Sequence, residues 1–282
     1  MGRPMALNLI KGGHSLAVWS RRAETAHPLV DAGAVRCASP AEVAQHSEVV
    51  FTMVTAGADV EAVALGDAGI INGAAPGTTV IDCSTIDAAT TRRLAAELRV
   101  AHVHLLDAPV SGGEAGAVAG TLSIMIGGEQ QVFERMRPVL GCVGKTLVYI
   151  GPSGSGQIAK AANQLALVVT IQGIAEAMVY ARANGVDFRP VWQAMMKGVA
   201  GSRMLEVVGQ RMINREFVMG IDASLHHKDA HIVLQTAQAS RTAVPGAALA
   251  AQAFNALFAR SGVKWDSAAI LAVLEEMNGQ KG

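Results

Sequence analysis

The stretch Leu-Asp-Ala-Pro-Val-Ser-Gly-Gly at residues 106–113 says most about the fold of this 282-residue chain. Its apolar start predicts a buried strand, and its Ser-Gly-Gly end predicts a turn that exposes a hydroxyl and backbone N–H groups. These donors suit a carboxylate, and glycines let a ligand approach the backbone closely. Because α/β folds bind ligands at the carboxyl ends of their strands, the position favours a binding role. A plain turn between strand and helix is the alternative.

A second motif, Gly-Ser-Gly-Gln-Ile-Ala-Lys-Ala-Ala-Asn at residues 154–163, predicts the start of a long helix. Lys160 and Asn163 stand three residues apart, so they share one face of that helix. A lysine inside an apolar helix must reach a cavity, a partner or water. Burial or a nearby cation would lower its pKa, which would make it a general acid for a reacting oxygen. A lysine that extends to the surface is the alternative.

Apolar runs alternate with helical patterns in the first half of the chain. Strands are expected at residues 15–19, 49–54, 78–83, 102–110, 122–126 and 146–150. Helices are expected at residues 4–11, 42–46, 60–65, 87–99 and 130–140. This rhythm predicts an α/β fold, a Rossmann-like doubly wound parallel sheet with helices on both faces.

The strand rhythm stops after Ile150. Helices are expected at residues 157–184, 189–197, 202–214, 225–240, 245–260 and 267–278. We therefore expect two domains, residues 1–151 with the sheet and residues 152–282 built only of helices. A single continuous α/β domain is disfavoured, because nothing after Ile150 resembles a buried strand.

Composition narrows the classes of partner. The formal net charge is zero, with no basic stripe or charge run, so we expect no nucleic-acid partner. The apolar stretch 158–179 contains Lys160 and several amides, so we expect a buried helix and no membrane span. No signal peptide is apparent, and the cysteines lack CxxC spacing, which favours a reduced, cytoplasmic protein. These cysteines are Cys37, Cys83 and Cys142.

The two motifs, in this order, resemble those of the β-hydroxyacid dehydrogenase family, which includes 3-hydroxyisobutyrate dehydrogenase and tartronate semialdehyde reductase. The resemblance extends from Met1 to about Asn278. It implies an oxidoreductase that transfers a hydride between NAD(P) and the β-carbon of a small hydroxy acid or semialdehyde. It also implies that Lys160 is the catalytic acid/base and that the turn of Ser111, Gly112 and Gly113 binds the substrate carboxylate.

The resemblance implies further substrate contacts. Asn163 and Gln164 stand where the family has two amides, although packing is an equally good interpretation of Gln164. Lys228 stands in a Lys-Asp pair that the family places near substrate and nicotinamide. His226 and His227 precede it, but no third ligand has suitable spacing, so no metal site is expected.

Gly2 at the helix start and Ser20, Arg21 and Arg22 after the strand at 15–19 are expected to bind the cofactor. The resemblance implies further cofactor contacts, which are Met53, Val54, Ser84, Thr85 and Lys228. No acidic residue follows the strand at 15–19 to bind the ribose 2′-hydroxyl of NAD. A serine with two arginines suits a 2′-phosphate, so NADP is the preferred cofactor and NAD the second choice. The alternatives are two solvated arginines, and core packing for Met53 and Val54.

The chain opens with the end of a dinucleotide-binding pattern. Met1-Gly2 stands where the family has the last residues of Gly-Leu-Gly-x-Met-Gly. Such a fold has a strand and the first glycines ahead of this helix, so we expect about ten further residues before Met1 in the natural protein. Without that strand we expect a slot in the sheet, where each unpaired buried backbone group costs about 1–3 kcal/mol. A short variant with a repaired sheet is the alternative.

Within the family, the Lys-Ala-Ala-Asn-Gln motif at 160–164 and Leu-His-His-Lys-Asp at 225–229 favour 2-hydroxy-3-oxopropionate (tartronate semialdehyde) reductase. A 3-hydroxyisobutyrate dehydrogenase is the next interpretation, followed by another semialdehyde or glyoxylate reductase. An imine reductase is disfavoured because Lys160 is present. A non-catalytic cofactor-binding protein is the alternative from another class. The apolar helical half predicts a homodimer or homotetramer.

Overall fold

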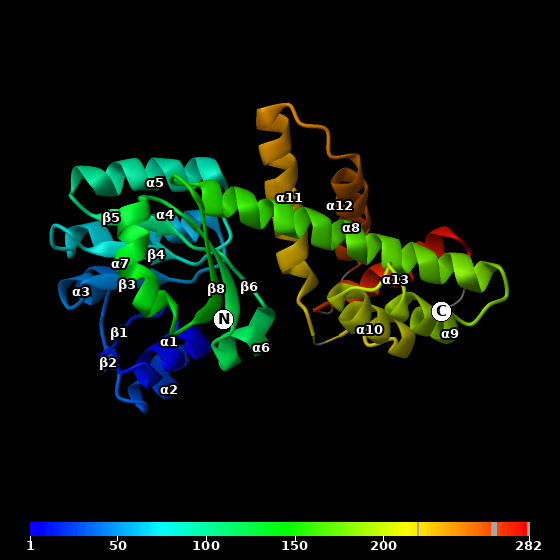
Figure 1. The fold of residues 1–282 in the computed structure, drawn as a ribbon, viewed down its shortest axis with the longest axis horizontal. Helices are drawn as coiled ribbons and strands as arrows, with labels where there is room; N and C mark the ends of the chain where they lie inside the picture. The colour runs from blue at the N-terminus through cyan, green and yellow to red at the C-terminus, as the bar shows by residue number, and fades with distance from the viewer. Residues whose placement is uncertain (219, 261–263, 281–282) are drawn as a thin grey trace. The chain divides into compact units, whose positions relative to one another are not determined.

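The computed structural model describes residues 1–218, 220–260 and 264–280. The chain divides into two compact units, which are Met1–Lys160 (unit 1, blue to green in Figure 1) and Ala161–Gly282 (unit 2, green to red). Within the described residues, the strands of both sheets belong to unit 1, and unit 2 is built of helices. The predicted fold class, an α/β region followed by an all-helical region, is confirmed.

The first five strands of unit 1 pair in parallel, in keeping with the parallel sheet that the sequence predicted. β1 (Ala17–Val18) and β2 (Val35–Arg36) form a two-stranded sheet. β3 (Val49–Thr52), β4 (Thr79–Asp82) and β5 (His104–Asp107) pair in that order within a second sheet. Every residue of β4 is buried, as expected for a strand covered on both faces. The carboxyl ends of β3, β4 and β5 therefore lie at one edge of the sheet.

The remaining strands correct the prediction in two ways. The strand expected at 102–110 is divided, because Pro109 has no N–H for a ladder and the chain leaves β5 before it. The residues that follow form β6 (Val110–Ser111), which pairs with β7 (Leu122–Gly127). β7 runs antiparallel to β5 and β6 and parallel to β8 (Gly144–Gly151), so the sheet is mixed.

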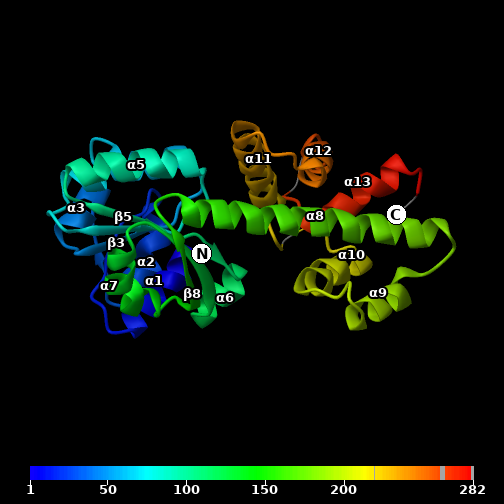
Figure 2. The ribbon, with the colours of Figure 1, turned by 45° about the horizontal axis from the view of Figure 1, so that its top comes forward.

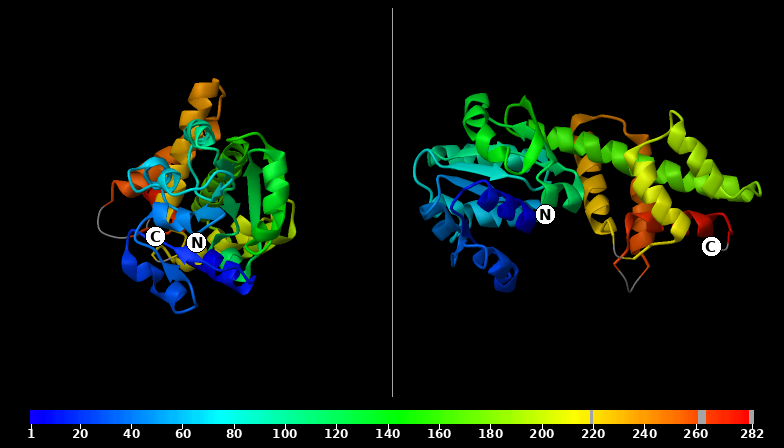
Figure 3. Two further views of the ribbon diagram at one scale, coloured as in Figure 1. Left: turned by 90° about the vertical axis from the view of Figure 1, so that its left-hand side faces the viewer. Right: turned by 60° about the horizontal axis from the view of Figure 1, so that its bottom comes forward.

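Helices cover both faces of the strands in unit 1 (Figures 1 and 3). They are α1 (Gly2–Lys11), α2 (His27–Val30), α3 (Pro40–Gln45), α4 (Gly57–Leu65), α5 (Ala88–Val100), α6 (Gly113–Ala119) and α7 (Gln130–Leu140), with 3-10 turns η1 (Ala23–Ala26) and η2 (Ile70–Asn72). The sequence did not predict α2, α6 or β2. They are two to seven residues long, too short for a periodic pattern to reveal.

A cavity of about 700 Å³ lies in unit 1 between the two sheets. Ala17 and Val18 of β1 line it, and so do the four residues of β3. β1 pairs with β2 and β3 pairs with β4, so within the described residues each has one edge without a strand partner. In a doubly wound sheet this is the position of the first strand. The slot expected from the sequence is therefore present, and no repaired sheet closes it.

Unit 2 packs around the second part of one long helix, α8 (Ser155–Ala183), whose first turns belong to unit 1 (Figure 2). The other helices are α9 (Phe188–Lys197), the π-helical turn η3 (Leu205–Gly209), α10 (Gln210–Asn214), α11 (Ala223–Ser240), α12 (Pro245–Phe258), the 3-10 turn η4 (Ser267–Ala269) and α13 (Ile270–Met277). Val168, Ile171 and Met178 of α8 belong to the buried core of this unit.

α8 is long and apolar enough to cross a membrane, and 50 % of its most apolar window is buried within the protein. Such a composition is also that of a core helix, and the buried residues of α8 contact the other helices of unit 2. Of the three free cysteines, Cys37 and Cys83 are buried and Cys142 is half-buried.

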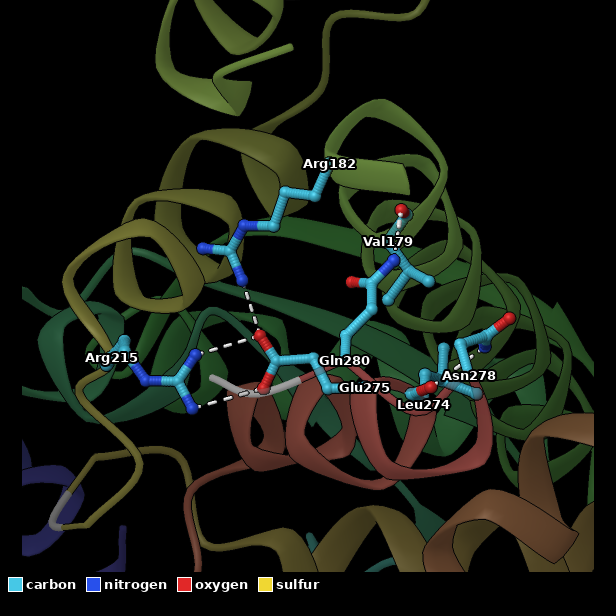
Figure 4. A network of polar contacts seen from close by, with 7 residues as sticks. All are labelled: Val179, Arg182, Arg215, Leu274, Glu275, Asn278 and Gln280. Carbon is cyan, nitrogen blue, oxygen red and sulfur yellow. Dashed lines mark hydrogen bonds and ion pairs between the residues drawn. The ribbon is translucent and has the colours of Figure 1, made fainter. Parts of the chain in front are cut away.

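A buried carboxylate joins three helical segments of unit 2 (Figure 4). Glu275 of α13 has a side chain that is only 3 % exposed. Arg215, which follows α10, donates to both of its oxygens at 2.8 and 3.1 Å. Arg182 of α8 also pairs with it. A bidentate guanidinium and a second cation compensate the charge that burial leaves on this carboxylate.

Candidate active site

Lys160 lies in the second turn of α8 and has only 7 % of its surface exposed. The alternative, a lysine that extends to the surface, does not fit this burial. A buried ammonium requires polar neighbours, and a lysine in such surroundings can exchange a proton with a molecule bound beside it.

The start of α8 is held by residues at the ends of β4 and β5. The carboxylate of Asp107 accepts hydrogen bonds from the backbone N–H groups of Gly154 and Gln157, at 2.8 and 3.0 Å. The amide of Gln157 donates to the backbone oxygen of Ser84 at 2.8 Å and accepts from the N–H of Ile86 at 3.2 Å. These buried contacts tie the helix that carries the predicted acid/base to two strand ends.

Two buried acids occupy neighbouring positions at this edge, since Asp82 and Asp107 are register partners on β4 and β5. Burial raises the pKa of Asp82 to about 6, against hydrogen bonds from Ser84 and Thr52 that lower it. Burial also raises the pKa of Asp107, and the N–H groups of Gly154 and Gln157 oppose that shift. The sequence did not reveal a role for either acid, although Asp82 lies two residues before Ser84 and Asp107 lies four residues before Ser111.

The Ser-Gly-Gly turn has the backbone that its sequence predicted. Ser111 ends β6, and Gly112 and Gly113 have positive φ angles of 134° and 64°. The backbone conformation at Gly112 favours glycine, and a Cβ there would also be crowded, 3.1 Å from Cδ2 of Leu122. The turn leads directly into α6. Its role in carboxylate binding stays a prediction.

The predicted substrate residues of unit 2 are joined in one chain of polar contacts. Nδ2 of Asn163 donates to Oε1 of Gln164 at 2.9 Å, and Nε2 of Gln164 donates to Oδ2 of Asp229 at 2.5 Å. The other oxygen of Asp229 pairs with Nζ of Lys228 at 2.8 Å. Asp229 therefore holds Lys228 and also orients Gln164.

Lys160, Asn163 and Gln164 lie within just over one turn of α8. Positions three and four residues apart share a helix face, so one continuous element carries the predicted acid/base and both amides. The spacing predicted from the sequence is therefore realised in a helix without a break.

Except for Lys228, which lies on α11 of unit 2, the predicted cofactor residues lie at the strand ends and helix start of unit 1. Gly2 begins α1, and a Cβ there would lie 3.6 Å from Cβ of Met53. The N–H of Val54 donates to Oγ of Ser84 at 3.0 Å, which joins the segments after β3 and β4. Thr85 follows directly. Gly2, Met53 and Val54 also line the cavity between the sheets.

The segment after β1 carries the predicted phosphate-binding residues. Oγ of Ser20 lies 2.6 Å from Oγ1 of Thr25. Arg21 pairs with Asp59 at 3.0 Å, yet its side chain remains 80 % exposed. Arg22 is exposed as well. Two exposed guanidinium groups, a glycine at a helix start and partly exposed apolar side chains fit the phosphate, ribose and adenine parts of NAD(P).

The histidines beside Lys228 contact side chains of other helical segments in unit 2. Nδ1 of His226 lies 2.7 Å from Oγ of Ser267, and Nε2 of His227 lies 2.7 Å from Oδ1 of Asn255. The described residues contain no group of three His, Cys, Asp or Glu side chains arranged to hold a metal ion.

Comparison with known families covers nearly the whole chain. Residues 1–151 match the family described as the NAD binding domain of 6-phosphogluconate dehydrogenase. Residues 154–274 match the NAD-binding family of NADP-dependent 3-hydroxyisobutyrate dehydrogenase. The two matches meet near the start of α8.

Individual relatives with dehydrogenase or reductase names agree with the family matches. The 2-hydroxy-3-oxopropionate reductase of Escherichia coli (strain K12) is 40 % identical over 281 residues, which cover 100 % of this chain and 96 % of the relative. The NAD-dependent L-serine dehydrogenase of Pseudomonas aeruginosa is 35 % identical, with 99 % and 96 % covered. The solved structure of Mycobacterium tuberculosis 3-hydroxyisobutyrate dehydrogenase with L-serine has a TM-score of 0.89 at 28 % identity, over 97 % of this chain and 95 % of that one.

Proposed function

This chain belongs to the β-hydroxyacid dehydrogenase family and is an NAD(P)-dependent oxidoreductase acting on a hydroxyl group, and we propose that its substrate is 2-hydroxy-3-oxopropionate. It would reduce the aldehyde of this substrate to give the 2,3-dihydroxy acid. The relative that is 40 % identical and bears this activity in its name supports the choice. The Lys-Ala-Ala-Asn-Gln motif at 160–164 supports it from the sequence.

The proposed chemistry divides between cofactor and protein. NAD(P)H, when bound, supplies the hydride for the aldehyde carbon of the substrate. The ammonium of Lys160 donates a proton to the aldehyde oxygen and becomes a neutral amine, and it takes the proton back when the alcohol is oxidised. The burial of Lys160 on a helix held at the strand ends is the observation that carries this assignment.

The remaining polar residues position the substrate in this proposal. The N–H groups and hydroxyl of Ser111, Gly112 and Gly113 bind its carboxylate. Asn163 and Lys228 orient the reacting end, and Gln164 keeps Asn163 in place through their mutual hydrogen bond.

Turnover of four substrates tests the proposal. The purified protein is assayed with tartronate semialdehyde and methylmalonate semialdehyde in the reductive direction, and with L-serine and 3-hydroxyisobutyrate in the oxidative direction. We expect kcat/KM to be highest for tartronate semialdehyde. A higher kcat/KM for methylmalonate semialdehyde would instead identify a 3-hydroxyisobutyrate dehydrogenase. A higher kcat/KM for L-serine would identify an activity like that of the L-serine dehydrogenase of Pseudomonas aeruginosa. Cofactor binding without any turnover would favour the non-catalytic alternative.

We also propose that NADP is preferred over NAD, because Arg21 and Arg22 stand exposed after β1. The double variant Arg21→Ala/Arg22→Ala should raise KM for NADPH by about 10- to 100-fold, because the 2′-phosphate loses its charged partners. KM for NADH should stay within about twofold. Arg99→Ala, which removes an exposed arginine at the end of α5, is the control. Equal effects on the two cofactors would contradict the preference.

Three broader features remain proposals. We place the domain boundary at Gly151–Pro152, before α8, and the protein in the cytoplasm as a homodimer or homotetramer. The exposed apolar side chains of Leu225, Leu249 and Phe258 in unit 2 support self-association. Sedimentation at several protein concentrations measures the oligomeric state directly.

A further inference from the structure

Asp107 makes an unusual contact for a residue inside a sheet. It is the last residue of β5 and 0 % exposed, and its carboxylate receives two backbone N–H groups from the start of α8. Asp107 and Gly154 are 47 residues apart in sequence. A carboxylate at a helix start also interacts favourably with the helix dipole. Asp107 therefore connects β5 to the start of α8 through two hydrogen bonds.

Two glycines allow this close approach. A Cβ on Gly127 would lie 2.5 Å from Oδ1 of Asp107, and a Cβ on Gly156 would lie 2.4 Å from the backbone oxygen of Met125. Neither position has room for a side chain. The first turn of α8 thus lies directly against the ends of β5 and β7, with its orientation set by backbone contact and by the carboxylate.

Gln157 adds a second connection on the neighbouring strand. Its amide makes both of its hydrogen bonds to the segment after β4, at Ser84 and Ile86. Lys160 follows Gln157 by three residues on the same continuous helix, so a tilt or shift of the first turn moves Lys160 as well.

We propose that Asp107 is a positioning residue for Lys160: it sets the start of α8 so that the lysine amine meets the substrate oxygen. The inference rests on the proposed function, in which Lys160 is the acid/base. The physical reason is the sensitivity of proton and hydride transfer to placement, since an error of about 1 Å can cost about 100-fold in rate.

Asp107→Asn tests this role, because it replaces one acceptor oxygen by an NH₂ group that faces a backbone N–H. The start of α8 must then shift, and the buried negative charge one turn before Lys160 is lost. We expect kcat per bound cofactor to fall by about 10- to 100-fold, with KM for the cofactor within about threefold. The basic limb of the kcat–pH profile, which reports protonated Lys160, should move to lower pH by about half a unit, because a nearby anion favours the charged lysine.

Asp87→Ala is the matched control. Asp87 caps α5 by accepting the N–H of Thr90 at 2.8 Å, in the same unit but on another helix. The Asp87→Ala variant should have a lower melting temperature but an unchanged kcat–pH profile. If Asp107→Asn does not fold, Gln157→Ala provides the second variant, because it removes only the connection to the segment after β4. A smaller fall in kcat is expected, with the pH limb unmoved because Asp107 keeps its charge.

A double-variant cycle separates this inference from the proposed function. In a Lys160→Ala background, Asp107→Asn should change the remaining kcat by less than about twofold, because its effect acts through the lysine. A full 10-fold further loss in that background would overturn the positioning role. An unchanged pH limb in Asp107→Asn would overturn it too. If Lys160→Ala alone retains full activity, the proposed function itself is wrong.

Discussion

Lys160 is the residue on which the proposed reaction depends most. Lys160→Ala should lower kcat by about 10²- to 10⁴-fold, because the reacting oxygen loses its proton donor. Cofactor affinity, measured by fluorescence titration, should change little. The matched control is Lys145→Ala, which removes an exposed lysine from β8. Equal activity losses in the two variants would show that Lys160 has no special role.

The raised pKa of Asp82 predicts that the stability of the folded protein depends on pH. Its pKa is raised to about 6 in the folded protein from an ordinary value of 3.8, so the folded state binds this proton more tightly than the unfolded state does. The stabilisation is therefore complete below pH 3.8 and is lost as the pH rises through about 6. The full difference is on the order of 2–3 kcal/mol.

Asp82→Asn removes this titration. The free energy of unfolding of the wild-type protein, relative to that of Asp82→Asn, should fall between pH 4.5 and pH 7.5 by about 2 kcal/mol. Denaturant titrations at both pH values measure it. Asp107, the neighbouring acid that contributes repulsion, is present in both proteins, so its own titration cancels to first order. Parallel stability–pH curves would contradict the raised pKa.

At the scale of elements, α13 is held by Glu275 and its two arginine partners. Glu275→Gln leaves Arg182 and Arg215 facing a neutral amide, and breaking such a buried pair typically costs about 3–5 kcal/mol. The midpoint of thermal unfolding should fall by roughly 10 °C. Circular dichroism at 222 nm follows the transition.

The neighbouring residue provides the control for this prediction. Glu276 pairs with Arg260, but its side chain is 77 % exposed, so water screens the pair. Glu276→Gln should leave the unfolding midpoint unchanged within error. If both variants lower the midpoint equally, burial of the Glu275 pair has no special stabilising effect.

Elements with a long, regular pattern were predictable from the sequence. The predicted helices at 87–99 and 130–140 correspond to α5 and α7, with ends that differ by at most one residue. Breaks inside a continuous pattern were harder to see. The helix expected at 202–214 starts with the π-helical turn η3 where Gly209 lies against Trp192, a tertiary contact that local periodicity does not encode.

At the scale of the whole molecule, the cavity between β1 and β3 leaves one edge of each strand without a strand partner. An apolar strand and a short glycine turn fused ahead of Met1 should enter this cavity and pair with both open edges. Each new backbone hydrogen bond contributes about 0.5–1.5 kcal/mol, so the unfolding midpoint should rise by roughly 10 °C. We also expect tighter NADPH binding, because the turn adds N–H groups at the start of α1.

A Gly/Ser extension of equal length is the control for the fused strand. It adds the same number of residues but cannot fill an apolar cavity, so it should leave the midpoint and NADPH affinity unchanged. If the apolar strand and the control behave alike, the cavity does not accept a strand, and the sheet is stable in two parts.

The sequence by itself determined the class of fold, the division into a sheet region and a helical region, and the predicted site motifs. These follow from local chemistry: apolar periodicity, glycine turns, and a lysine and amide three residues apart. Only the tertiary structure decided which strands pair, that the sheet is split around a cavity, and how Lys160 is held. Asp107 and Gly154 are distant in sequence, and so are Gln164 and Asp229, which are 65 residues apart. Their contacts depend on the packing of separate elements, and such packing leaves no periodic signal in a single sequence.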